Sequence, residues 1–180
     1  MQDHRSPMSA RIRPATVADA SELLDVKITL DHETPFMMLE PGERNRDIEA
    51  LAKPLRERDE LSNSVVLVAE EEGRLVGYVE ATGGAFNRNR HRADVVMGVL
   101  QVASGRGVGS LLLEALDIWA ERHGISRLEL TVMSHNKRAI ALYERRGYRT
   151  EGLRKRSVRV GSEYIDELAM VKLLDVEPAV

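Results

Sequence analysis

Residues 104–110 read Ser-Gly-Arg-Gly-Val-Gly-Ser, and they stand between an apolar stretch and a strongly amphipathic helical pattern. A helix leaves its first backbone N–H groups unpaired and carries about half a positive charge at its N-terminus. Because Gly105, Gly107 and Gly109 lack a Cβ atom, an anion can approach such amides closely. The segment therefore predicts a phosphate-binding turn. A tight strand-to-helix turn with no ligand fits the glycine spacing equally well.

The sequence on either side of the turn favours the ligand-binding interpretation. Val95, Val96, Val99 and Val102 form a β-branched run that predicts a mostly buried strand. After the turn, apolar residues recur at helical spacing, as in a helix that packs one face on a sheet. These residues are Val108, Leu111, Leu112, Ala115, Leu116 and Trp119. Strand, glycine turn and helix are therefore consecutive.

Two common nucleotide-binding motifs do not fit this turn. The dinucleotide fingerprint requires Gly-x-Gly-x-x-Gly and an acidic residue that closes the next strand. Here the third glycine comes one residue too early, and the acid of the next apolar run, Glu129, stands in the middle of residues 126–132. A Walker loop is excluded because no Gly-Lys-Ser or Gly-Lys-Thr follows.

The composition fits one domain. With 180 residues, of which 43% are hydrophobic and 31% charged, the chain can bury a single substantial core. We expect this domain to span residues 10–175, after a flexible segment at residues 1–9. The net charge of −3 argues against a nucleic-acid partner. The basic clusters at residues 87–92 and 154–159 are interpreted as a solvated loop or an edge strand rather than as sites for an anion or an acidic partner.

Targeting and redox signals are missing from the sequence. It contains no cysteine, which excludes disulfides and a thiol nucleophile. No apolar run approaches the ~20 residues of a membrane span, and residues 1–7 lack the apolar stretch of a secretory signal. We therefore expect a cytoplasmic protein without a membrane partner.

Hydrophobic periodicity and turn residues predict elements in the order β, α, α, β, β, β, α, β, α, β, β. The expected elements are a strand at residues 11–14, a helix capped by residues 16–19 that runs to about residue 30, an irregular loop at residues 32–44, a charged helix at residues 45–58 interrupted near Pro54, strands at residues 65–70 and 75–81, the strand and helix around the glycine turn, a strand at residues 126–132, a helix at residues 136–146, and two strands that turn near Gly161 and Ser162.

With these elements, the chain resembles the GNAT superfamily of acyl-CoA N-acyltransferases from residue 10 to residue 173. The similarity is densest from Val99 through the glycine turn to residues 128–132, and it continues in Asn136, Ala139, Leu142, Tyr143, Gly147 and Tyr148. Residues 161–167 and the loop at residues 36–44 look most like small-amine, amino-acid or ribosomal-protein N-acyltransferases. The resemblance implies an α/β (α+β) fold with a central mixed, mainly antiparallel sheet flanked by helices.

The resemblance also implies a coenzyme A site. Backbone amides of the turn, from Gly105, Arg106, Gly107, Val108, Gly109 and Ser110, would wrap the pyrophosphate, at the anion site that the helix terminus predicts. The pantetheine arm would pair with the strand that ends at Val99, whose N–H would polarise the thioester carbonyl. The family usually opens the loop with Gln or Arg, whereas this chain has Ser104, so we expect weaker binding, with Arg106 supplying the missing charge.

Acyl transfer from a thioester to an amine requires a neutral amine, a stabilised oxyanion and a proton for the departing thiolate. The resemblance assigns the proton to the Tyr143 hydroxyl and a bond to the cofactor to Asn136. Asn136 stands seven residues before Tyr143, about two helical turns, so both side chains project from nearly the same helix face. A core role for Tyr143 and an N-cap role for Asn136 are the alternatives.

The sequence leaves open which carboxylate deprotonates the amine. Asp94 stands where relatives that resemble phosphinothricin acetyltransferases keep a carboxylate, but it also fits an exposed residue at the start of a strand. Glu33, from the irregular loop, and Glu80, from a neighbouring strand, are further carboxylates that can face the acceptor.

The apolar segment Phe36, Met37, Met38 and Leu39 is expected either to roof the acceptor pocket or to be buried in the core. His32 and His135 are isolated histidines and are interpreted as surface residues or as residues that support the site, rather than as catalytic residues. No spacing of ligand-type residues indicates a metal site.

We therefore predict an acetyl-CoA-dependent N-acetyltransferase that moves an acetyl group directly to a primary amine in a ternary complex. The acceptor is a small amine, an amino acid or a protein N-terminus. Relatives often pair their C-terminal strands between subunits, so a homodimer is expected. A non-catalytic acyl-CoA-binding or sensing protein is the alternative, because Ser104 departs from the family pattern and the base is open. A protein-interaction module without coenzyme affinity is a third possibility.

Overall fold

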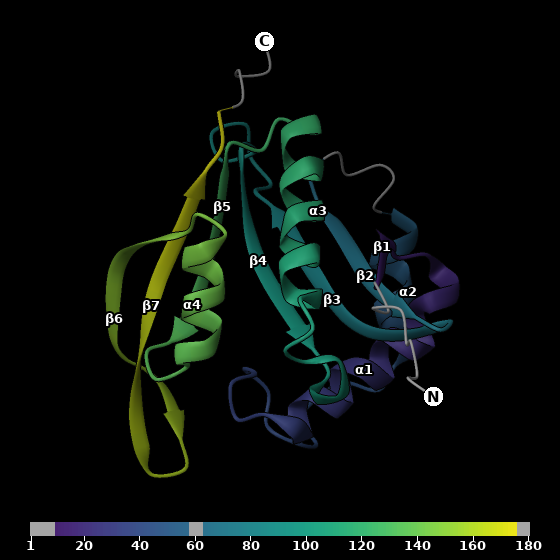
Figure 1. Ribbon diagram of the computed structural model, residues 1–180, viewed down its shortest axis with the longest axis horizontal. Helices are drawn as coiled ribbons and strands as arrows, with labels where there is room; N and C mark the ends of the chain where they lie inside the picture. The colour runs from purple at the N-terminus through teal and green to yellow at the C-terminus, as the bar shows by residue number, and fades with distance from the viewer. Residues whose placement is uncertain (1–9, 58–62, 176–180) are drawn as a thin grey trace, which may run out of the picture.

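Seven strands form one sheet in residues 10–57 and 63–175, the part of the chain that the computed structural model describes (Figure 1). Their order across the sheet is β1-β2-β3-β4-β5-β7-β6. The strands are β1 (Arg11–Pro14), β2 (Val65–Glu71), β3 (Arg74–Gly83), β4 (Arg92–Val99), β5 (Arg127–Met133), β6 (Arg149–Val160) and β7 (Glu163–Leu173). Every neighbouring pair is antiparallel except β4 and β5, which run parallel. Residues 1–9, expected to precede the domain, lie outside the described residues.

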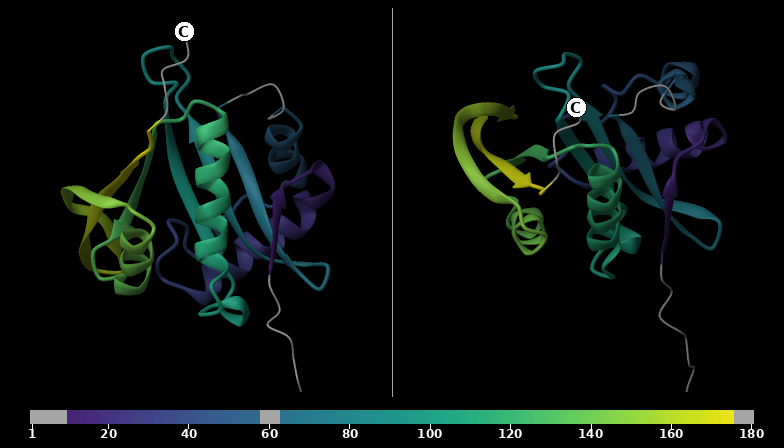
Figure 2. Two further views of the ribbon diagram at one scale, coloured as in Figure 1. Left: turned by 45° about the horizontal axis from the view of Figure 1, so that its top comes forward. Right: turned by 90° about the horizontal axis from the view of Figure 1, so that it is seen from above.

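Helices cover both faces of this sheet. The α-helices are α1 (Ala20–Glu33), α2 (Ile48–Glu57), α3 (Val108–Arg122) and α4 (Lys137–Arg145), with short 3-10 helices η1 (Val17–Asp19) and η2 (Gln101–Ala103). Helices α3 and α4 lie on one face, and α1 and α2 lie on the other (Figure 2). The structure thus confirms the predicted mixed architecture and order of elements. Among the helices of the described residues, none combines the length and the apolar character that crossing a bilayer requires.

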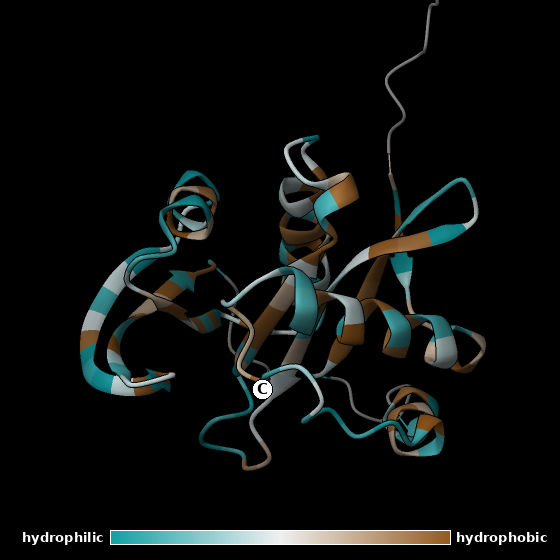
Figure 3. Ribbon diagram, turned by 90° about the horizontal axis from the view of Figure 1, so that it is seen from below, coloured by the Kyte–Doolittle hydropathy of each residue, from teal (hydrophilic) through white to brown (hydrophobic). Residues whose placement is uncertain are grey.

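The sheet separates two hydrophobic clusters, one beneath each helix layer. On β2, Leu67 and Ala69 belong to the larger cluster beneath α3, whereas Val66 and Val68 belong to the smaller cluster beneath α1 and α2. This alternation follows from the two-residue period of a strand. Figure 3 shows mainly hydrophobic residues on the central strands, whereas the outer strand β6 is mainly hydrophilic and mostly exposed.

Strands β4 and β5 separate soon after they meet. Arg92, Ala93 and Asp94 lie opposite residues 127–129, and no pairing continues beyond Asp94. Each strand keeps its antiparallel neighbour on the other side, β4 with β3 and β5 with β7. Within the described residues, one backbone edge of residues 95–99 is therefore left without a ladder partner.

The strand before the glycine turn differs from the prediction. It ends at Val99, and residues 101–103 form η2. Val96 is 51% exposed and Val102 is 74% exposed, so the valine run is not buried throughout. Val96 is exposed because it lies beyond the point where β5 leaves β4, and Val102 is exposed because it belongs to η2 rather than to the strand.

Two boundaries nearer the N-terminus are also corrected. Helix α1 extends to Glu33, so His32 and Glu33 belong to a helix and not to the irregular loop. Helix α2 continues through Pro54 without interruption. Proline in a helix removes one backbone hydrogen bond, and here the burial of Ala52 and Leu55 in the smaller cluster offsets that loss.

The predicted hairpin between β2 and β3 is confirmed. Its two turn residues, Glu72 and Gly73, have φ values of 50° and 76°. Positive φ at both central residues is the requirement of a type I′ turn, which matches the twist of the strands that it joins.

A charged network ties β1 to the start of α1. The Asp19 carboxylate accepts hydrogen bonds from both terminal nitrogens of Arg13 at 2.8 Å and from the Thr16 backbone N–H at 2.7 Å. Arg13 Nε also donates to Glu70 on β2 at 2.9 Å. The hydrogen bonds from Arg13 lower the pKa of Asp19 to about 2, from an ordinary value of 3.8.

We expect Asp19→Asn to be less stable than the wild type near neutral pH and to lose less of its stability in acid. Because the folded-state pKa is depressed, the contribution of Asp19 is present above pH 3.8 and disappears as the pH falls towards 2. Denaturant unfolding across that interval measures the difference, with Asp25→Asn, an exposed change on α1, as the control. If the free energy of unfolding of Asp19→Asn and of the wild type fell equally as the pH decreased, the assignment would be contradicted.

Candidate functional site

The gap between β4 and β5 opens into a cleft of about 760 Å³. Its walls come from the end of α1 and the loop after it, from β4, from the glycine turn, and from β5, α4 and β7. The lining residues are Leu30, Glu33, Thr34, Phe36, Met37 and Met38; residues 95–99; Gln101, Ala103, Ser104 and Gly105; residues 107–110; residues 131–133; and Asn136, Arg138, Ala139, Leu142, Tyr143, Arg145 and Glu167. The cleft thus brings most of the predicted site residues together.

The glycine turn presents free backbone amides to this cleft. Gly105 and Gly107 have φ values of 81° and 85°, a region where a side chain is strained. The first helical hydrogen bond of α3 runs from Leu111 N–H to the Gly107 carbonyl. The amides of residues 108–110 precede that bond, so they have no partner within the helix. These three residues line the cleft, where their amides form a helix terminus of the kind that suits an anion.

Gly109 allows α4 to pack against the start of α3. A Cβ atom on Gly109 would lie 2.9 Å from Leu142 Cδ2 and 3.3 Å from Met97 Cε. The first of these distances is shorter than any normal contact, so a side chain at this position would displace the Leu142 methyl group. The third glycine of the turn therefore makes room for Leu142 of α4 beside the start of α3.

The positive charge beside the turn comes from a different residue than predicted. The Arg106 guanidinium donates to the buried Glu71 carboxylate at 2.6 Å, and Arg106 is not among the lining residues. Arg138, in the first turn of α4, lines the cleft instead, and its Nη2 would lie 3.7 Å from a Cβ atom on Gly105. Ser104 also lines the cleft, and its role in cofactor binding stays a prediction.

The unpaired edge of β4 points a donor into the cleft. Leu100 N–H donates to the Val76 carbonyl of β3 at 2.9 Å. Because backbone N–H groups alternate in direction along a strand, Val99 N–H points away from β3 and towards the gap. Val99 lines the cleft, so its amide faces the space between the two strands.

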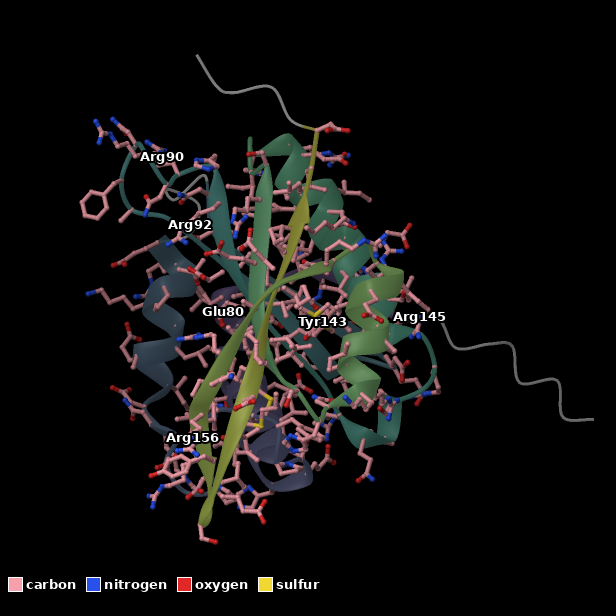
Figure 4. The ribbon with its side chains drawn as sticks, turned by 90° about the vertical axis from the view of Figure 1, so that its left-hand side faces the viewer. Glu80, Arg90, Arg92, Tyr143, Arg145 and Arg156 are labelled. Carbon is pink, nitrogen blue, oxygen red and sulfur yellow. The ribbon has the colours of Figure 1, made fainter. Side chains whose placement is uncertain are left out.

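Helix α4 contributes both residues that were predicted from it. Asn136 is its N-cap, and Asn136 Oδ1 accepts a hydrogen bond from Ala139 N–H at 3.2 Å, which leaves the side-chain amide nitrogen for the cleft. Tyr143 is buried between α4 and the sheet, as Figure 4 shows, and its ring lies 5.7 Å from that of Tyr148. Burial raises the pKa of Tyr143 to about 12, so the phenol stays protonated at neutral pH.

The apolar loop after α1 forms the opposite wall. Phe36, Met37 and Met38 line the cleft, and the Phe36 ring lies 5.2 Å from that of His135. The loop is anchored by a buried ion pair in which Arg44 Nε donates to Asp31 at 2.6 Å. Leu39 does not share this position, because it lines a second cavity of about 310 Å³ between α1 and α2.

The structure separates the three carboxylates proposed as the base. Glu33 lines the cleft at the end of α1, and one of its oxygens accepts the Gln101 N–H at 2.8 Å. Glu80 lies on the far side of the strands from Tyr143 (Figure 4), beside the second cavity, and binds Lys27 at 2.9 Å. Asp94 is exposed at the last paired rung of β4 and β5 and lies outside the cleft lining. Partial desolvation of its carboxyl group at this rung, together with the adjacent Glu129, raises the pKa of Asp94.

Among the lining residues that were not predicted, the charged residues Arg138 and Glu167 each have a signal in the sequence. Arg138 places a cation in the first turn of α4, where the helix dipole disfavours one, so a functional reason for it was to be expected. Glu167 is a single charge among alternate apolar residues of its strand, Ile165, Ala169 and Val171. Among the described residues no group of three or more potential ligands surrounds a metal position, and the expectation that no metal is used stays a prediction.

The family model that matches the chain is described as the Acetyltransferase (GNAT) family, and it covers residues 29–148. A mycothiol acetyltransferase from Jonesia denitrificans is 37% identical over 84 residues, which are 47% of this chain and 26% of that protein. The chain therefore spans about a quarter of that relative's length. The L-amino acid N-acetyltransferase of Escherichia coli strain K12 is 32% identical over 111 residues, which are 59% of this chain and 67% of that protein.

Solved structures share the whole fold. A GNAT-family acetyltransferase from Streptococcus pneumoniae has a TM-score of 0.88 and 32% identity over 92% of this chain and 99% of that one. A ribosomal-protein-alanine N-acetyltransferase from Brucella melitensis has a TM-score of 0.80 and 30% identity over 91% of this chain and 99% of that one. An acetyltransferase from Salmonella typhimurium, solved with acetyl-CoA and described as putative, has a TM-score of 0.83. Its identity is 23% over 94% of this chain and 96% of that one.

The family model thus extends across the loop after α1, the separated strands, the glycine turn and α4, which together build the cleft. With two thirds of its length matched by the family model and its fold shared with a solved member at a TM-score of 0.88, the chain belongs to the acetyltransferase (GNAT) family.

Proposed function

We propose that this chain is an acetyl-CoA-dependent N-acetyltransferase that moves the acetyl group directly to a primary amine within a ternary complex. The observation that carries the proposal is the cleft in which the free amides of α3, the unpaired edge of β4 and the Tyr143 hydroxyl meet. No cysteine is available to carry an acyl group, which supports transfer without an acyl-enzyme.

The residues of the cleft suit coenzyme A. A diphosphate would accept hydrogen bonds from the amides of residues 108–110, beside the Arg138 guanidinium. An extended chain that carries amide groups would pair with the open edge of residues 95–99, since the strand there has no ladder partner. Asn136 would bond the same molecule through its side-chain nitrogen. The acetyl-CoA bound to the Salmonella relative, which shares the fold, supports this choice.

Two groups of the chain would serve the reacting thioester. Val99 N–H would donate to the carbonyl oxygen as negative charge develops on it. Tyr143 would give its phenolic proton to the departing sulfur, and its raised pKa of about 12 keeps that proton in place at neutral pH.

The acceptor would enter from the side of the apolar loop, under Phe36 and Met37. The Escherichia coli relative is named for amino acids and the Brucella relative for a ribosomal-protein alanine. An amino group of a small molecule or of a protein N-terminus is therefore the proposed acceptor class. We also propose a homodimer, because β6 is the outer strand of the sheet and is exposed along most of its length. The cytoplasmic location stays a prediction.

Thiol release from acetyl-CoA with a panel of small amines, amino acids and peptides tests the function. Turnover with at least one amine is expected. Binding of acetyl-CoA without thiol release for any amine, equal in the wild type and Tyr143→Phe, would favour the acyl-CoA sensor instead. Failure of calorimetry to detect acetyl-CoA binding would contradict both.

For Tyr143→Phe, we expect turnover to fall by about 10²-fold or more, the usual effect of losing a general acid. The affinity for acetyl-CoA should stay within about twofold, because the ring and its packing against Tyr148 are kept. Steady-state kinetics and calorimetry measure the two quantities. Unchanged turnover would remove Tyr143 as the proton donor.

For Gly107→Val, we expect the affinity for acetyl-CoA to fall about tenfold or more, since a β-branched residue at a φ of 85° is strained by roughly 1–2 kcal/mol and displaces the amides of α3. Gly73→Val is the matched control. Gly73 also has positive φ and open space around it, but it lies in the β2–β3 turn, away from the cleft. Equal affinities of folded Gly107→Val and Gly73→Val would contradict the phosphate site.

A further inference from the structure

Glu167 is a buried carboxylate in the cleft. It lies on β7 opposite Met133 of β5, and the residue is only 5% exposed. It lines the same cleft as Tyr143 and the apolar loop after α1. Within residues 10–57 and 63–175, the structure gives its carboxylate no hydrogen-bond or ion-pair partner.

Among the described residues, Glu167 is the one buried acidic residue in this situation. Three other acidic residues are buried in the described part of the chain, and each is paired with an arginine: Asp19 with Arg13 at 2.8 Å, Asp31 with Arg44 at 2.6 Å, and Glu71 with Arg106 at 2.6 Å. A buried carboxylate without a partner is costly. Glu167 therefore stands where an incoming cation would supply the missing partner.

The direction of Glu167 follows from its strand. Leu168 and Met170 pack in the larger cluster beneath α3 and α4. Since side chains alternate along a strand, Glu167 points to the other face, the face of α1 and its apolar loop. Its neighbour on β6, Arg154, is exposed and forms no ion pair with it among the described residues. Tyr143 belongs to the larger cluster, so the two side chains approach the cleft from opposite faces of the sheet.

We infer that Glu167 accepts the proton of the acceptor ammonium ion, and that the acceptor is a primary amine carrying an apolar group. This inference rests on the proposed N-acetyltransferase function. The apolar group would lie against Phe36, Met37 and Met38, and the ammonium would pair with Glu167. The other carboxylates are less suited, because Glu33 already accepts the Gln101 amide and Asp94 lies outside the lining.

The proton transfers balance as follows. The ammonium gives one proton to Glu167, and the freed lone pair of the nitrogen forms the C–N bond to the acetyl carbonyl carbon. As the C–S bond breaks, the sulfur takes the phenolic proton of Tyr143. The new amide nitrogen carries one surplus proton, which returns to Tyr143. Glu167 then releases its proton to solvent, so the products are an amide, a thiol and one proton.

The test compares two probes of matched size. Phenethylamine is an ammonium ion at neutral pH and must be deprotonated, whereas O-benzylhydroxylamine is a weak base and is already neutral. Both are assayed by thiol release with the wild type, Glu167→Gln and Glu163→Gln. Glu163 is an exposed residue of the same strand and lies outside the cleft lining, so it controls for the change of charge.

For Glu167→Gln we expect kcat/KM to fall about 10²- to 10⁴-fold with phenethylamine, but by less than about tenfold with O-benzylhydroxylamine, because that nucleophile needs no base. Glu163→Gln should match the wild type with both probes. Calorimetry without acetyl-CoA gives a readout independent of turnover. There phenethylamine should bind Glu167→Gln about tenfold or more weakly, since a charge-assisted hydrogen bond is lost.

An equal loss with both probes would overturn the role, because it would indicate a structural effect of the substitution. So would unchanged turnover, or a larger loss in Asp94→Asn than in Glu167→Gln. Wild type that acetylates other amines but not phenethylamine overturns the acceptor class, whereas no thiol release with any amine means that the proposed function itself has failed. If Glu167→Gln does not bind acetyl-CoA, Glu167→Asp is assayed in its place, and the same dependence on the probe is expected.

Discussion

The early separation of β4 from β5 is the constraint on which the site depends. The sheet tolerates it because each strand keeps an antiparallel partner on its other side, β3 for β4 and β7 for β5. The gap exposes backbone N–H and C=O groups that would form hydrogen bonds between β4 and β5 if the two strands stayed paired. It also lets side chains from both faces reach one cleft, which an unbroken sheet would forbid.

Buried ion pairs hold the walls of the cleft in place. Asp31 and Arg44 fix the apolar loop to α1, and Glu71 and Arg106 tie the glycine turn to the end of β2. In each pair the buried charge is compensated, so breaking one partner is expected to cost more than an exposed pair would. The arginine inside the turn therefore acts as a structural tether. The Arg138 guanidinium lies 3.7 Å from a Cβ atom built on Gly105 and lines the cleft.

Among the described residues, two buried ionisable groups line the cleft, one suited to donate a proton and the other to accept one. Tyr143 is kept protonated by burial on the face of α3 and α4. Glu167 lies on the other face, without a partner among the described residues. A proton donor on one side of the gap and a proton acceptor on the other suit a reaction in which the leaving sulfur and the attacking nitrogen come from different directions. The sheet thus places the proton donor and the proton acceptor on opposite faces, whereas a single polar pocket would place them side by side.

The sequence by itself determined the order of elements, the glycine turn before α3, and the positions of Asn136 and Tyr143 on α4. These features follow from local rules of periodicity, capping and glycine conformation, so they can be predicted from neighbouring residues. Only the tertiary structure decided that Arg106 binds Glu71, that Arg138 stands at the turn, and that Glu167 rather than Asp94 lines the cleft. Those outcomes depend on which strands become neighbours and where β4 and β5 part, and contacts between residues so distant in sequence leave no local pattern.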